Sequence, residues 1–117
     1  MGREYELRDR TKQFALRTIR LFSALPKSGE AQVIGKQLLR SGTSVAANYR
    51  EACRSRSDAE LVSKLSIVEQ EFDESLLWLE LLVESGIMPE AKLAELRKES
   101  DELLRMTVAS IKTLKSR

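Results

Sequence analysis

Hydrophobic residues recur every three or four positions along most of the chain, which is the spacing of a helix with one buried face. Over residues 3–24 this stripe contains Leu7, Thr11, Phe14, Thr18 and Leu21. The pattern stops at Pro26 and Gly29, because proline disfavours helical geometry at the residue before it and glycine relaxes the turn. We therefore expect an amphipathic helix over residues 3–24.

A second periodic segment runs from Gly29 to about Arg54, and its core-facing stripe is unusually polar. Gly42, Thr43 and Ser44 lie in its middle, where the glycine alone lowers helix stability by about 1 kcal/mol. The segment fits either one helix that bends near Gly42 or two shorter helices. We expect one helix.

Capping residues mark the start of the third and fourth helices. Ser57, followed three residues later by Glu60, has the capping-box arrangement, in which each side chain satisfies a backbone N–H of the other residue. The third helix is therefore expected over residues 58–84, up to a break at Gly86. Pro89 is expected in the first turn of the last helix, where its missing N–H costs nothing.

Short connections join these segments, which forces neighbouring helices to lie antiparallel. The prediction is an all-α fold, an antiparallel up-down-up-down four-helix bundle. With 117 residues, 42% of them hydrophobic, the chain is large enough for one core and too small for two. We therefore expect a single domain over residues 1–117.

Several apolar residues of the third segment lie outside its main core-facing stripe. They are Ile67, Trp78 and Leu81. A helix that is apolar nearly all round is usually buried on several sides, which a four-helix monomer does not provide. We therefore expect a homo-oligomer with these residues at its interface. The alternative is that Trp78 covers the end of the core beneath a loop.

The chain offers few residues for catalysis. It has no histidine, the commonest general base and metal ligand, and no phosphate-binding loop, nucleophile elbow or zinc-helix motif. Glu51, Glu71 and Glu74 do not complete a two-metal site, which normally includes histidines. Cys53, the only cysteine, is expected as a partly buried core residue. We predict no catalytic, cofactor or metal site, and hence no enzyme.

The distribution of apolar residues also bears on location. No stretch approaches the roughly 20 apolar residues of a membrane-spanning helix. The N-terminal segment lacks the apolar part of a signal peptide. We expect a cytoplasmic protein without membrane contact.

Polar residues gather where the second and third segments are expected to meet: Arg40, Ser41, Ser44, Asn48, Glu51, Glu71 and Glu74. A tight reversal between these segments places Arg40 near Glu74, and Ser41 and Ser44 near Glu71. A partly buried ion pair fixes the register of two helices even where it adds little stability. We interpret the cluster as structural. The alternative is a polar pocket for a partner's side chain or backbone.

Charge is divided unevenly along the chain, although the net charge is only +2. Residues 1–56 contain 12 Lys and Arg against 5 Asp and Glu, whereas residues 57–117 contain 8 against 13. Contiguous cations bind nucleic acid by releasing its counterions. The candidate nucleic-acid contacts are Arg8, Lys12, Arg20, Arg50, Arg54 and Arg56. The alternatives are a solvated charged surface and attraction between oppositely charged helices of the same chain.

Three stretches of sequence together carry a family resemblance. Phe14–Pro26 has the pattern FxLRxIxLxxxLP, Gln37–Ala52 reads QLLRSGTSVAANYREA, and residues 55–82 read SRSDAELVSKLSIVEQEFDESLLWLELL. They resemble the bacterial four helix bundle protein family, also called the 23S rRNA-intervening sequence protein family, over essentially the whole chain. Two positions depart from its pattern: Gln70 replaces a frequent lysine, and Ala52 a frequent glycine.

The resemblance implies an antiparallel four-helix bundle that assembles as a homopentameric ring. It also implies kinship in fold with accessory proteins of the reverse transcriptases of diversity-generating retroelements, whose basic surface is thought to engage nucleic acid. We predict a non-enzymatic homo-oligomer, a pentamer on this resemblance, that binds RNA or a ribonucleoprotein through a basic surface. The alternative is a protein–protein interaction scaffold or accessory subunit without nucleic-acid contact.

Overall fold

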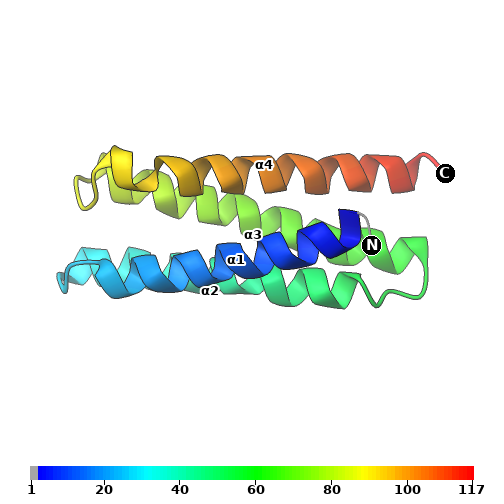
Figure 1. Cartoon of the computed structure of the whole chain (residues 1–117), viewed down its shortest axis with the longest axis horizontal. Coiled ribbons are helices and arrows are strands. Elements are labelled where there is room, and N and C mark those ends of the chain that lie inside the picture. Colours follow the sequence, from blue (N-terminus) through cyan, green and yellow to red (C-terminus); the bar gives the residue numbers. More distant parts are fainter. Residues whose placement is uncertain (1–2) are drawn as a thin grey trace.

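Four long helices make up the bundle in the computed structural model, which describes residues 3–117 (Figure 1). Their bounds are α1 Arg3–Ala24, α2 Gly29–Ala52, α3 Asp58–Glu84 and α4 Glu90–Lys115. Each helix runs antiparallel to the one before it, so α1 begins and α4 ends at the same end of the molecule. The predicted up-down-up-down four-helix bundle is confirmed.

The helix ends agree with the predicted ones to within two residues. α2 ends at Ala52 instead of Arg54, because the backbone N–H groups of Arg54 and Ser55 already belong to a tighter turn, bonded to the carbonyls three residues earlier. Pro89 lies just before α4, in extended geometry, instead of inside its first turn. Neither shift alters the path of the chain.

The start of α3 carries only half of the predicted capping box. The Ser57 hydroxyl accepts a hydrogen bond from the Glu60 N–H at 3.1 Å, as expected of an N-cap. The Glu60 carboxylate, however, accepts from the N–H of Arg56 at 3.4 Å and not from that of Ser57. The two bonds satisfy one backbone donor in the first turn of the helix and one just before it.

α2 is one continuous helix, and Gly42 is the reason that it packs closely on α1. A Cβ atom added at Gly42 would lie 2.5–2.9 Å from side-chain atoms of Thr18, closer than such atoms approach one another. Both residues are buried. The glycine that lowers helix propensity therefore provides the close contact between the two helices.

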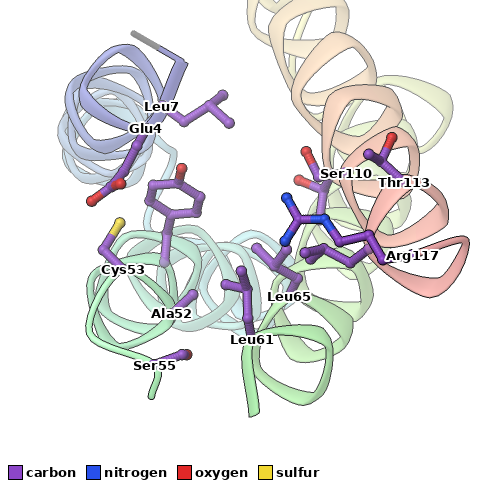
Figure 2. Close-up of a pocket in the computed structure, with 13 residues that line it drawn as sticks. Glu4, Leu7, Ala52, Cys53, Ser55, Leu61, Leu65, Ser110, Thr113 and Arg117 are labelled. Carbon is purple, nitrogen blue, oxygen red and sulfur yellow. The ribbon is translucent and has the colours of Figure 1, made fainter. Parts of the chain in front are cut away.

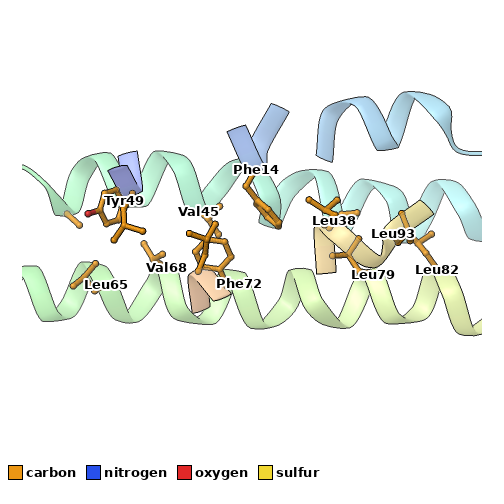
Figure 3. Packing of buried hydrophobic residues seen from close by; sticks show 14 of the residues in the cluster. Phe14, Leu38, Val45, Tyr49, Leu65, Val68, Phe72, Leu79, Leu82 and Leu93 are labelled. Carbon is orange, nitrogen blue, oxygen red and sulfur yellow. The ribbon is translucent and has the colours of Figure 1, made fainter. Parts of the chain in front are cut away.

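The core runs the length of the bundle between all four helices. At its centre the rings of Phe14 and Phe72 meet edge to face, with centroids 5.4 Å apart. Figure 3 shows Val45 beside them, and Leu38 and Leu79 farther along the same layer. The core also encloses several hydroxyl side chains, namely Thr11, Thr18, Ser41, Ser75, Ser100 and Thr107.

Neighbouring helices are not equally well packed. α2 and α3 pack against each other most extensively, whereas α1 and α4 touch least. Polar contacts contribute to the join between α1 and α4, because the Arg10 guanidinium binds Glu99 at 2.6 Å and Glu102 at 3.2 Å. The bundle is therefore least closed along the seam between its first and last helices.

Candidate interaction surfaces

Arg40 holds α2 to α3 by binding two carboxylates. Its two terminal nitrogens lie 3.0 Å from Glu71 and 2.5 Å from Glu74. The side chain of Glu71 is only 11% exposed, whereas that of Arg40 is 50% exposed. The guanidinium therefore compensates the nearly buried negative charge of Glu71. Removing either residue would leave the charge of the other without its partner.

A buried hydroxyl pair lies beside this ion pair. The Oγ atoms of Ser41 and Ser75 are 2.8 Å apart, and the Ser75 hydroxyl also lies 2.9 Å from the Glu71 carbonyl. Both serines are fully buried. Since a displacement of one residue along either helix would separate the hydroxyls inside the core, the pair favours one register of α2 on α3.

The other residues of the predicted polar cluster do not join this site. Asn48 donates to the carbonyl and hydroxyl oxygens of Ser44, within α2, so Ser44 does not bind Glu71. Glu51 pairs with Lys64 at 3.0 Å, nearer the end of the helix. The predicted cluster is therefore a series of separate contacts along the seam between α2 and α3.

Two partners in these contacts escaped the sequence analysis. Ser75 lies opposite Ser41, and Lys64 lies opposite Glu51. The antiparallel register that places Arg40 beside Glu74 therefore also predicts these two pairs. Arg10 is different, because its carboxylate partners lie on a helix that no short turn connects to α1. The hydrogen bond that it donates to Glu99 raises the pKa of Arg10 above its ordinary value.

The predicted nucleic-acid contacts are all exposed, but they do not form one patch. Arg8 lies close to Cys53, where α1 begins and α2 ends, and Arg50, Arg54 and Arg56 follow at that end of α2. Arg20 instead lines a depression between α1 and α4 together with two further cations, Arg17 and Lys92.

None of these predicted contact residues forms an ion pair within residues 3–117. Cations that do have a carboxylate within 4 Å lie elsewhere: Arg10, Arg40, Lys64, Arg97, Arg105 and Arg117. Arg10, Arg40 and Lys64 join different helices and Arg97 and Arg105 pair within α4, whereas the predicted contact residues remain available to an anion.

The apolar residues assigned to an interface differ in exposure. Ile67 and Leu81 are each 37% exposed, whereas Trp78 is half-buried and packs against the core. The indole N–H of Trp78 is covered and has no acceptor among the described residues. Leu77 of the same helix is 45% exposed, so α3 presents apolar side chains to solvent on more than one side.

α2 extends this apolar surface. Arg40 on α2 pairs with Glu74 on α3, and two helical turns farther along this antiparallel pair Val33 lies opposite Leu81. Val33 is 65% exposed, although it is apolar. It is an interface candidate that the third segment alone did not reveal.

The described residues contain no group of three or more His, Cys, Asp or Glu side chains placed to hold a metal ion. Cys53 is half-buried against the core, and burial raises the pKa of its thiol. Within the described chain, none of the helices combines the length and apolarity needed to cross a bilayer.

Comparison with known proteins identifies the family. The family described as 23S rRNA-intervening sequence protein matches residues 3–109, nearly the whole chain. The chain belongs to this family. A member of the S23 ribosomal protein family from Bacteroides thetaiotaomicron, whose crystal structure is described as that of a protein with unknown function, is similar to it in both sequence and fold.

That structure is 33% identical in sequence and superposes with a TM-score of 0.86, covering 93% of this chain and 97% of its own. Neither the family description nor that of the neighbour names an enzymatic activity. Among curated proteins, none matches the chain. Family membership therefore agrees with the bundle fold. The binding partner has to be inferred from the charged and apolar residues on the surface of the bundle.

Proposed function

We propose that this family member is a non-enzymatic, cytoplasmic homo-oligomer that binds RNA or a ribonucleoprotein through the basic surface of α1 and α2. The observation that carries the proposal is the division of the cations. The exposed arginines and lysine predicted as contacts have no carboxylate partner in the described structure, while the cations at the helix seams are paired. Unpaired cations release the counterions of a polyanion without first breaking an internal ion pair.

A salt titration tests this proposal. We expect the protein to bind a fragment of large-subunit ribosomal RNA in a filter assay at low ionic strength. The logarithm of the affinity should fall linearly with the logarithm of salt concentration, with a slope of about −0.7 to −0.9 for each phosphate neutralised. Absence of binding at low salt, or an affinity independent of salt, would contradict the proposal.

Self-association is the second part of the proposal, and the face shared by α2 and α3 supports it. The Arg40–Glu74 ion pair is flanked by Val33 and Leu81 seven residues away on one side, and by Ile67 seven residues away on the other. The buried part of a subunit interface is more apolar than the rest of a protein surface, and arginine is enriched there. We propose a ring of five copies, the number that the resemblance implies, closed by contacts between two different faces.

Leu81→Glu is expected to dissociate the oligomer. Leu81 is partly exposed, so the new carboxylate leaves the folded monomer intact but places an unpaired charge in the apolar interface. Light scattering should give a multiple of the 13.3 kDa chain mass for the natural protein and the monomer mass for the variant. Val108→Glu is the matched control, because Val108 on α4 has the same 37% exposure. Equal dissociation by both variants would contradict this interface.

The apolar face of α2 and α3 also favours the alternative function, an accessory subunit that binds another polypeptide without nucleic acid. The two proposals differ in what the face binds. Three results together would establish the alternative. The natural protein would be monomeric by light scattering, it would not bind RNA, and one host protein would copurify with it in stoichiometric amounts. Loss of that protein with Leu81→Glu would place it on this face.

A further inference from the structure

A cavity of about 340 Å³ lies inside the bundle at the end where α1 begins and α4 ends (Figure 2). All four helices contribute to its wall. It lies where α1 and α4 pack least closely and where small residues, Ala52, Thr107 and Ser110, line the wall. Its volume falls within the range of small-molecule sites.

The interior of this cavity is mainly apolar. Leu7, Leu61, Leu65 and Leu114 form much of its wall. The hydroxyls of Thr107 and Ser110 are already used, since they donate to carbonyls of their own helix at 2.8 and 3.0 Å. These walls suit a hydrocarbon chain or ring.

One polar group of the wall lacks a partner. The Ser55 hydroxyl is covered by other atoms and forms no hydrogen bond within the described residues. Because other atoms cover it, a molecule in the cavity does not reach this hydroxyl, and the accessible wall remains mainly apolar.

The charges at the mouth are balanced. The Arg117 guanidinium lies 3.2 Å from both carboxylate oxygens of Asp58. Glu4 and Arg8, one helical turn apart on α1, carry opposite charges near Cys53, although no ion pair joins them. No net charge is therefore left at the mouth to compensate an ionised ligand, and burying an uncompensated ion is costly.

We infer that this cavity binds a small, uncharged amphipathic molecule, whose apolar part lies against the leucines and whose hydroxyl or amide group lies at the mouth near Glu4 and Arg117. None of the residues predicted as RNA contacts lines the cavity. Its occupancy and RNA binding can therefore fail independently.

A set of three related probes tests the inference. Hexanol, hexanoate and hexylamine share one chain and differ in charge. Titration monitored by methyl NMR should give saturable shifts of the Leu61, Leu65 and Leu114 methyl groups. Hexanol should bind at least about tenfold more tightly than either ion. No saturable shift at these methyls, or equal affinity for all three probes, would overturn the inference.

Ser110→Leu is expected to abolish hexanol binding by filling the cavity. Ser66→Leu is the matched control: Ser66 is also half-buried and also donates to the carbonyl four residues earlier, but it does not line the cavity. Binding that survives Ser110→Leu would overturn the site. If that variant does not fold, the natural protein still decides, because bound hexanol should slow labelling of the Cys53 thiol, which lines the cavity. An unchanged labelling rate at saturating hexanol would count against it.

Discussion

Replacing Gly42 with alanine is expected to destabilise the bundle by about 1–2 kcal/mol, although alanine is the better helix former. Helix propensity alone favours the substitution by about 1 kcal/mol. The new methyl group, however, would lie 2.5–2.9 Å from the side chain of Thr18, which is fully buried and branched at Cβ. The cost of moving α1 away from α2 exceeds the propensity gain. Urea denaturation at a constant m-value measures the difference.

Two further variants separate the packing effect from helix propensity. Gly29→Ala should change stability by less than about 0.5 kcal/mol, because nothing lies within 4 Å of its added Cβ. Thr18→Ala removes the two atoms closest to the new methyl group, so the double variant should lose less stability than the sum of the single variants. A stabilising effect of Gly42→Ala would show that the helices separate without cost.

Charge reversal at Arg50, Arg54 and Arg56 is expected to lower RNA affinity by about 100-fold at moderate salt, or about 2.7 kcal/mol. These cations are exposed and unpaired in the described structure, so their replacement by glutamate should leave the fold intact. The salt dependence should become shallower as well, because fewer phosphates are neutralised. Filter binding over a range of salt concentrations measures both quantities.

The matched control reverses three cations on α4, namely Lys98, Lys112 and Lys115. They too are exposed and have no carboxylate partner among the described residues, so the net charge changes equally. A large loss of affinity only with the arginine variant would assign binding to the α2 end. Equal losses with both variants would indicate general attraction of a polyanion to the whole protein.

Much of the fold follows from local signals in the sequence. The apolar period, the Ser57 cap and the short turns predict the helices and the antiparallel pairing of neighbours. The same reasoning placed Arg40 beside Glu74, because a tight turn sets the register of the helices on either side of it. Ser44 was placed near Glu71, but its hydrogen-bond partner is Asn48, one turn along the same helix.

Contacts between α1 and α4 are not predictable in this way. Arg10 and Glu99 are 89 positions apart, and no short connection fixes how their helices align. The cavity depends on the same alignment: Thr107 and Ser110 are recognisable as small residues on a core-facing stripe, but only the spacing of the helices decides whether a void remains. The role of Gly42 is hidden for the same reason. The sequence reveals its low helix propensity, but not that Thr18 on α1 leaves no room for a larger side chain.

The weak seam between α1 and α4 also gives the bundle a way to open. Local opening requires least free energy where the fewest buried contacts must be lost. The helices on either side of this seam belong to two hairpins that stay joined through the extensive packing of α2 on α3. The hairpins can therefore part at their free edges while Phe14 and Phe72 hold the centre. Amide hydrogen exchange should then be fastest in the first turns of α1 and the last turns of α4, along the route by which a molecule enters.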